Sequence, residues 1–306
     1  MSSKLGGIFS GLIIARLIRP LDGRAWPATI GLFFLCTVGV VTYHLWSHYG
    51  DTIVSQPKYQ LDPNRLRITP QPDYIRSDVK EAAITLGRLT GANLLDPQLV
   101  LQVRQAFAVQ PWVKQVRSVN KSFPSTVEVD LVYRRPIAMV ETPAGMFPPH
   151  DYEGLLPIDG QAYLLPVEVS EQEATRFPKI AGIDSSPTGP PGSPWGDIRV
   201  AEAARIVALL EEIWDELGLL KVEVPPKNSP LENTDETFYL ITKQRNRVRW
   251  GSAPGAESTG EESAQEKAVA LREYARSQGS LDTWVEQHRK AEANLSDLLD
   301  WSRLNL

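Results

Sequence analysis

Two short patterns in the sequence contain residue types that could carry out chemistry. Ser118 and Lys121 match Ser-x-x-Lys, the nucleophile pattern of penicillin-interacting serine enzymes. In those enzymes the pattern opens a helix, whereas here it falls in a predicted strand. Neither Ser-Asp-Asn nor Lys-Thr-Gly, which accompany it in such enzymes, occurs in the chain. We therefore interpret the match as coincidental.

A metal site is the second chemical possibility. His44 and His48 are four residues apart, on one face of a helix, and Asp51 is the only nearby third ligand. We interpret this pair as interfacial polar residues beside Tyr43 and Tyr49. No Gly-x-Ser-x-Gly and no glycine-rich phosphate loop occurs. We expect no catalytic, cofactor-binding or metal-binding residues, and hence a binding protein rather than an enzyme.

Composition excludes several classes of protein. The chain has 306 residues and a formal net charge of -5, which does not suit a basic nucleic-acid binder. The single cysteine, Cys36, excludes an intramolecular disulfide and a cysteine-based zinc finger. The length suits two globular domains in addition to an anchor.

An apolar segment near the N-terminus predicts a membrane anchor. Residues 28–46 contain no Asp, Glu, Lys or Arg and are about long enough to cross a bilayer as a helix. Four basic residues precede it: Lys4, Arg16, Arg19 and Arg24. By the positive-inside rule they place an N-terminal tail, residues 1–27, in the cytoplasm and the chain after the anchor outside. A cleaved signal peptide is the rival interpretation, but no Ala-x-Ala site follows. A third interpretation of this segment is a helix buried in the core of the protein. Residues 5–18 either lie on the membrane surface or form a disordered tail.

After a polar stalk, residues 47–64, the pattern predicts a β-α-α-β-β unit over residues 65–136. A short strand at 66–69 precedes a helix at 77–89. Asp96 suits the N-cap of a second helix, with Pro97 at its first position. That helix has to end before Pro111. Strands then follow up to Lys121 and over 126–134, the second with the alternation of a half-buried strand.

The region 137–279 predicts a second domain of mixed α/β type with an antiparallel sheet. Strands are expected at 137–141, 155–158, 163–166, 220–224, 238–242 and 247–250. Helices are expected at 200–217 and 261–278. Residues 184–196, rich in proline and glycine, predict an irregular loop. Residues 280–306 follow a helical pattern. Arg245, Arg247 and Arg249 predict a basic side of a hairpin, either solvated or in contact with an acidic cell-wall polymer.

Short motifs follow one another along this unit: Gly-x-Asn-Leu-Leu at 91–95, Pro-Trp-Val at 111–113, the turn motif Phe-Pro at 123–124, a valine-rich strand and Arg-Pro-Ile-Ala at 135–138. Their order and spacing resemble the POTRA domain of the FtsQ/DivIB family of bitopic bacterial division proteins. The resemblance is close over residues 74–140 and looser as far as 274. A Phe-Pro-Lys-Ile-Ala-Gly segment at 177–182 and Lys267 also resemble the family. The motif residues to which we assign a structural or interaction role are Gly91, Asn93, Leu94, Leu95, Pro111, Trp112, Val113, Phe123, Pro124, Arg135 and Pro136.

The C-terminus departs from the family, which ordinarily ends in a strand carrying Ile-Asp-Leu-Arg. In the family, the last helix and this strand form the docking surface for the small coiled-coil proteins FtsB and FtsL. The divergent segment 280–306 either replaces that surface, caps the domain or binds a partner helix. The candidate docking residues are Tyr274, Trp284 and Arg303.

The resemblance implies a non-enzymatic scaffold or regulator in septal cell-wall assembly. Such a protein is single-pass, in the bacterial cytoplasmic membrane and at the division septum, with its C-terminal domains outside. Its partners would be FtsB-like and FtsL-like proteins and septal synthase components, without nucleic acid or a small-molecule substrate. The alternative is a chaperone-like POTRA module in outer-membrane protein assembly or secretion, although neither a repeat nor a series of barrel strands appears. A cell-wall enzyme is the third possibility.

Overall fold

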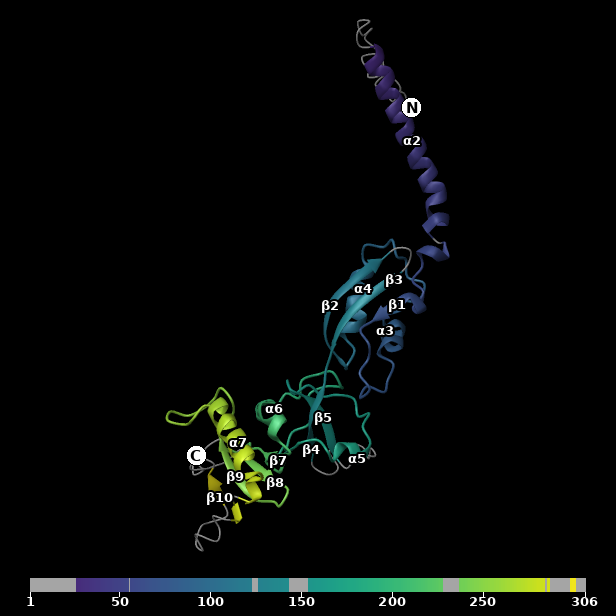
Figure 1. Cartoon of the computed structure of the whole chain (residues 1–306). Coiled ribbons are helices and arrows are strands. Elements are labelled where there is room, and N and C mark those ends of the chain that lie inside the picture. Colours follow the sequence, from purple (N-terminus) through teal and green to yellow (C-terminus); the bar gives the residue numbers. More distant parts are fainter. Residues whose placement is uncertain are drawn as a thin grey trace, which may run out of the picture. The chain divides into compact units, whose positions relative to one another are not determined.

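A computed structural model describes residues 26–54, 56–122, 126–142, 154–227, 237–283, 285–286 and 298–300. The chain divides into two compact units. One comprises the residues up to Gln60 together with Asn93–Leu95, and the other comprises Leu61–Ala92 together with the residues from Asp96 onward. The protein is of mixed α+β class, with one long N-terminal helix and two β-sheets (Figure 1).

The N-terminal helix α2 (Trp26–Val54) contains a segment that is long and apolar enough to cross a membrane, Ile30–Gly50. Its 21 residues correspond to about 30 Å of helix, which matches the hydrocarbon core of a bilayer. None of this segment is buried inside the protein, which does not fit the interpretation as a core helix. A signal sequence near an N-terminus can also contain a helix that is this long and apolar. The helix continues past residue 46, and the predicted stalk therefore begins later than expected.

The first sheet has three strands in the order β1-β3-β2. β1 (Leu66–Ile68) runs parallel to β3 (Thr126–Tyr133), and β2 (Val113–Ser122) runs antiparallel to it. Between β1 and β2 lie the helices α3 (Val79–Gly87) and α4 (Leu99–Ala108), so the predicted strand-helix-helix-strand-strand order is present. α4 packs on β2 and α3 packs on α4. The opposite face of the sheet stays open and polar, and a shallow hollow of about 250 Å³ lies on it.

The two helices are amphipathic, and α4 begins later than predicted. α3 starts at the N-cap Asp78, whose carboxylate accepts the N–H of Glu81 at 2.9 Å. We expected Asp96 to cap α4, but Gln98 occupies the cap position without a side-chain bond. The Asp96 carboxylate instead accepts the N–H of Gln98 at 2.8 Å, because a separate turn precedes the helix. The side chains that α4 buries are Leu99, Val103, Ala106 and Phe107.

The second sheet has seven strands in the order β10-β9-β8-β7-β6-β4-β5. They are β4 (Pro136–Glu141), β5 (Leu155–Asp159), β6 (Lys179–Ala181), β7 (Leu219–Glu223), β8 (Phe238–Thr242), β9 (Arg247–Gly251) and β10 (Leu298–Asp300). The expectation of an antiparallel sheet is wrong in part. β4, β6 and β7 are mutually parallel, as are β9 and β10, because helical or irregular segments carry the chain back between them.

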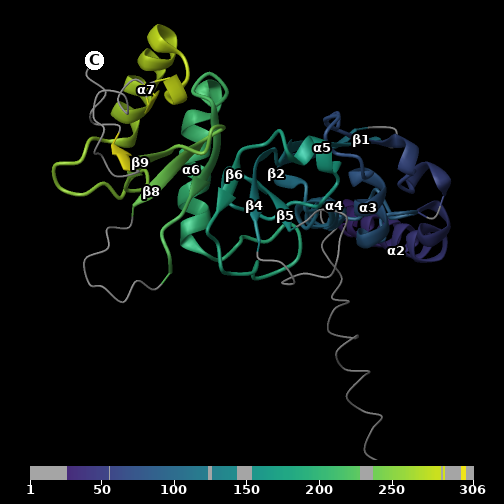
Figure 2. The same ribbon diagram turned by 90° about the horizontal axis from the view of Figure 1, so that it is seen from below.

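Helix α6 (Ile198–Leu210) provides most of the cover for this sheet. It packs on β4, β6 and β7 and contacts α7 (Ala264–Gln278) (Figure 2). The predicted helix over 200–217 is shorter, since a 3-10 turn, η3 (Glu211–Ile213), follows it. The predicted apolar stripe is nevertheless buried throughout: Ala203, Ile206, Val207, Leu210, Ile213, Trp214 and Leu217. Gly218 then turns the chain in a left-handed conformation, with φ of +69°.

The predicted irregular loop at 184–196 contains no helix or long strand, but its position is fixed by specific contacts. Trp195 is 1% exposed. Asp197 caps α6, and the guanidinium of the buried Arg199 bonds to the carboxylates of Asp197 and Asp184. The segment predicted as a strand at 163–166 forms isolated bridges instead, from Leu164 to β5 and from Tyr163 to this loop. A short helix, α5 (Glu171–Ala174), lies between this segment and β6.

The prediction of a helix over residues 280–306 is wrong for Leu298–Asp300, which form β10 beside β9. Pairing with the free edge of β9 satisfies the backbone there, and this tertiary contact overrides the helical pattern. Only 281–283 and 285–286 are helical among the described residues of this segment. Leu281 and Val285 are buried in the core of the second sheet, and the Asp282 carboxylate accepts the amide N–H of Asn246 at 2.8 Å. This part of the C-terminal segment therefore caps the domain.

Lys267 on α7 is fully buried. Its ammonium donates to the carbonyl of Trp250 at 3.0 Å and forms an ion pair with Glu261. Burial works to raise the pKa of Glu261, but hydrogen bonds from Lys267 and Ser252 outweigh it and lower the pKa to about 2. The resemblance to the family at Lys267 thus coincides with a residue that joins α7 to β9.

We expect Lys267→Ala to lower the free energy of unfolding by about 3–5 kcal/mol at pH 7, because it leaves a partly buried carboxylate without its cation. The control Lys243→Ala, in an exposed ion pair with Asp215, should change it by less than about 1 kcal/mol. Urea titration of the full-length protein, followed by tryptophan fluorescence, measures both.

The cost of Lys267→Ala should shrink as the pH falls below the ordinary glutamate value of 4.5. In the wild type the depressed pKa of Glu261 contributes stability that is complete above the ordinary value and is lost progressively as the pH falls from about 4.5 toward 2. In the variant the carboxyl, without its cation, takes up a proton more readily. Equal losses for both lysine variants at pH 7 would contradict this role.

Candidate interaction surfaces

The Pro-Trp-Val motif lies mostly inside the molecule. Trp112 is 3% exposed, and its indole N–H donates to the carboxylate of Glu168 at 2.9 Å. Gly192, with φ of +96°, approaches Pro111 so closely that an added Cβ would lie 3.0 Å from the proline Cα. The motif therefore contacts loops that connect the strands of the second sheet, and it does not form a free surface.

The carboxylate of Glu168 accepts hydrogen bonds from three N–H groups on the first-sheet side. Besides the Trp112 indole, the backbone N–H of Arg76 donates to it at 2.6 Å and that of Ser77 at 3.1 Å. Burial works to raise the pKa of Glu168, but these hydrogen bonds outweigh it and hold the pKa below its usual value. One carboxylate thus ties the start of β2 to the segment before α3.

A buried ion pair lies where the chain passes from one sheet to the other. The guanidinium of Arg134 bonds to the carboxylate of Asp159 at 2.6 Å, and their side chains are 8% and 4% exposed. The guanidinium also stacks on the ring of Tyr163, at 3.7 Å from its centroid. The other carboxylate oxygen of Asp159 accepts the N–H groups of Gln161 and Tyr163, each at 2.9 Å. Sequence analysis missed this pair, because Arg134 follows the polar side of the strand pattern.

Arg135 and Pro136, which we assigned to the motif, also lie at this junction. Arg135 forms a two-pronged ion pair with Glu211, and Pro136 is the first residue of β4. Arg76 likewise pairs with both carboxylate oxygens of Glu173, at 2.6 and 2.9 Å.

We define the seam as these contacts: Arg76 with Glu173, Trp112 with Glu168, Arg134 with Asp159 and Arg135 with Glu211. In each ion pair the first-sheet side supplies the cation and the second-sheet side the anion.

The Gly-x-Asn-Leu-Leu motif forms a turn. Gly91 has a left-handed φ of +71°, which favours glycine. The side chain of Asn93 accepts the N–H of Leu95 at 2.9 Å, and the N–H of Leu94 donates to the carbonyl of Tyr59 at 2.8 Å. Leu95 is 52% exposed. These residues have local structural roles, with Leu95 as their only large exposed side chain.

The strongest candidate surface for a partner is the outer edge of β2. This ten-residue strand pairs with β3 on one side and has no strand on its other side among the described residues (Figure 1). Lys114, Gln115 and Arg117 are exposed along it. Within the part of the chain that the structure describes, Lys114 and Arg117 make no ion pair. An unpaired edge of this length presents backbone donors and acceptors that a further strand can satisfy.

Of the candidate docking residues near the C-terminus, Tyr274 is the one that the structure describes. Tyr274 is 5% exposed and packs in the core beneath α7, a position that does not favour direct contact with a partner. Trp284 and Arg303 lie outside the described residues, as do Phe123 and Pro124 of the turn motif. The basic hairpin side is also less available than expected, since Arg247 pairs with Glu223 and stacks on Tyr239.

Ser118, Lys121 and His48 of the two chemical patterns make the following contacts. Ser118 lies in β2 and its hydroxyl accepts the amide of Asn120 at 3.3 Å, while Lys121 donates to the carbonyl of Asp96 at 3.2 Å. The ring of His48 contacts Tyr49 edge-on, with centroids 5.1 Å apart. Across the ranges that the structure describes, no group of three His, Cys, Asp or Glu side chains is placed to hold a metal ion.

Glu168→Ala should loosen the seam without unfolding the second sheet, because it removes the acceptor of three N–H groups. We expect hydrogen exchange of the backbone N–H groups of Arg76 and Ser77 to accelerate at least about tenfold, the equivalent of about 1.4 kcal/mol. Peptides from α7 should keep their exchange rates. The control Glu128→Ala, which removes an exposed carboxylate 3.6 Å from Arg67, should leave both regions unchanged. Unchanged exchange at Arg76 and Ser77 would contradict the role of Glu168.

No protein-family model matches the chain, and no curated protein matches it significantly in sequence.

Proposed function

We propose that this protein is a non-enzymatic, membrane-anchored scaffold of the bacterial division machinery, which recruits septal cell-wall synthesis proteins through its extracytoplasmic domains. One observation carries the proposal. The chain that follows a single exposed apolar helix builds a β-α-α-β-β unit, and the longest strand of this unit has an open edge.

The open edge supplies a binding mode that needs no catalytic residue. A partner strand that adds to β2 would satisfy its backbone groups, while alternate side chains would provide specificity. Lys114 and Arg117 repel the same edge of a second copy, and they attract an acidic strand. This favours a specific partner over self-association.

The resemblance to the FtsQ/DivIB family assigns the partner class. The β-α-α-β-β order occurs at the residues that carry the POTRA-like motifs, which supports the use of this resemblance. In the proposal, the motif residues Trp112 and Pro136, which are buried, and Arg135, which is exposed and paired with Glu211, keep the two sheets joined. The partners are then FtsB-like and FtsL-like proteins and septal synthase components, and the site of action is the septum.

A chaperone-like POTRA module for outer-membrane assembly or secretion is the second candidate, because the same edge could hold an extended substrate. The described residues contain one unit of this type and seven further strands in a single mixed sheet. Together with the apolar N-terminal helix, this arrangement favours the scaffold.

The anchor predicts an N-terminus in the cytoplasm and both sheets outside. Alkaline phosphatase forms its disulfides only outside the cytoplasm, so its fusion after Gln60 should be active and its fusion to the N-terminus inactive. Deletion of Trp26–Val54 should abolish the activity of the first fusion. The fusion protein should also remain membrane-bound at its full mass, and release of a shortened product would indicate a cleaved signal instead.

Affinity capture from native membranes tests the division role. We expect the full-length protein to recover coiled-coil division proteins and septal synthase components. The variant Lys114→Glu with Arg117→Glu should recover about fivefold less, because it reverses the charge of the β2 edge. The matched control, Lys80→Glu with Arg104→Glu, makes the same change of charge on α3 and α4, and it should bind normally.

Truncation after Glu286 separates two docking surfaces, because it keeps Leu281, Asp282 and Val285, which stabilise the second sheet, and removes the rest of the C-terminal segment. Recovery that survives the truncation but not the charge reversal places the partner on β2. Recovery lost only on truncation places it on the C-terminal segment. Recovery of outer-membrane assembly factors instead would overturn the scaffold in favour of the chaperone.

A further inference from the structure

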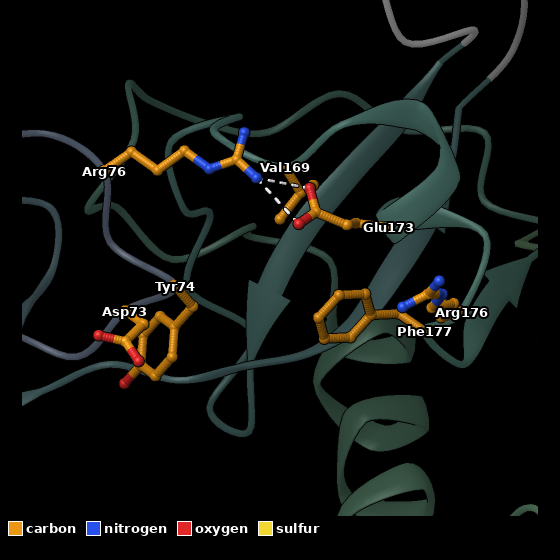
Figure 3. Close-up of a pocket in the computed structure, with 7 residues that line it drawn as sticks. All are labelled: Asp73, Tyr74, Arg76, Val169, Glu173, Arg176 and Phe177. Atoms are coloured by element: carbon orange, nitrogen blue, oxygen red, sulfur yellow. Dashed lines mark hydrogen bonds and ion pairs between the residues drawn. The ribbon is translucent and has the colours of Figure 1, made fainter.

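A pocket of about 320 Å³ opens at one end of the seam. It lies between the segment before α3, which provides Asp73, Tyr74 and Arg76, and the segment around α5, which provides Val169, Glu173, Arg176 and Phe177. Figure 3 shows the rings of Tyr74 and Phe177 on opposite sides of the space. Pockets that bind ligands span about 300–1,000 Å³, so this one has room for a large side chain and little more.

The walls of the pocket are held in place without an occupant. The hydroxyl of Tyr74 donates to the carbonyl of Arg134 at 3.2 Å, and its ring packs 6.1 Å from that of Trp112. Arg76 and Glu173 bond to each other at 2.6 and 2.9 Å across the top of the view in Figure 3. Glu173 also accepts the N–H and hydroxyl of Ser170, each at 2.7 Å. Binding would therefore need little reorganisation of these side chains.

Two side chains of opposite charge at the pocket have no partner among the described residues. Asp73 lies beside Tyr74 on one side, and Arg176 lies beside Phe177 on the other (Figure 3). Both residues are exposed, and neither side chain makes a hydrogen bond or ion pair with any residue that the structure describes. By contrast, Arg76 and Glu173 at the same pocket neutralise each other. The free anion and the free cation thus flank an aromatic slot.

We propose that this pocket binds one apolar or aromatic side chain of an extended peptide segment from a partner protein, with a basic residue beside Asp73 and an acidic residue beside Arg176. The aromatic walls select the central residue, and the two charges select the residues two positions before and after it. An extended peptide turns every second side chain to the same face, so these two residues can reach Asp73 and Arg176 while the central one is buried. The site is separate from the β2 edge and does not depend on the division role.

The test uses the full-length protein in lipid nanodiscs and blocked pentapeptides, observed by fluorine NMR. Their central residue is 4-fluorophenylalanine with an alanine on each side, and each peptide is named by its first, central and last residues. The wild type should broaden the signal of Lys-fluoroPhe-Glu at least fivefold more than those of Lys-fluoroPhe-Lys and Glu-fluoroPhe-Glu. Filling the slot by Val169→Trp should abolish the preference. Retained hydrogen-exchange protection at Arg76 and Ser77 checks that this variant keeps the seam.

Charge variants provide a second, independent readout at exposed positions. Asp73→Lys should shift the preference to Glu-fluoroPhe-Glu, and Arg176→Glu should shift it to Lys-fluoroPhe-Lys. The control Glu128→Lys, on the open face of the first sheet, should leave the preference unchanged.

Three outcomes would overturn the proposal: no broadening of any peptide, equal broadening of all three, or preferences that the charge variants do not shift. Free 4-fluorophenylalanine that binds as well as the preferred pentapeptide would also overturn it, since the pocket would then be a small-molecule site. If the preferences follow the charges, the pocket is a peptide site whether or not the capture experiment recovers division proteins.

Discussion

The ion pair between Arg134 and Asp159 is the interaction on which the relation of the two sheets depends. Only two residues separate the end of β3 from the start of β4, and one of them is Arg134. Removing two charges from water costs several kcal/mol per ion, and their attraction repays this only with good geometry and further hydrogen bonds. Here the aspartate accepts two more N–H groups and the arginine stacks on Tyr163. Breaking this arrangement would leave a buried charge unpaired, so other packings of the junction are disfavoured.

The remaining seam contacts are also polar, and they lie nearer the surface. The ion pairs of Arg76 and Arg135 are about half exposed and contribute little stability each. Glu168 differs, because its partners are N–H groups whose positions are set by the backbone and by the buried Trp112. Since Trp112 directly precedes β2, the start of the open edge is attached to the second sheet. A partner that adds to this edge would thus bind a strand with one fixed end.

Local patterns in the sequence predict most of the elements and little of the seam. The strand at 238–242 and the buried stripe of α6 follow from periodicity, which depends on neighbouring residues. The partners in the seam lie far apart in sequence, such as Trp112 and Glu168, or Arg135 and Glu211. Locally, each of these charged residues has the pattern of a solvent-facing side chain. β10 was missed for the same reason, because the edge of β9 rather than its own three residues makes it a strand. Lys267 was noticed only through a resemblance, and its burial against Trp250 has no local signal.

The order of strands has a consequence for how the chain folds as it is synthesised. In the second sheet almost every new strand lies beside the one made just before it, with β6 joining the free side of β4. Such a sheet can grow from β4 outward as each segment emerges, because each new strand finds a neighbour that has already been made. The first sheet cannot, because β1 pairs with β3 and therefore waits for both helices and β2. The N-terminal part, though it emerges first, has to remain open until residue 129 has been synthesised.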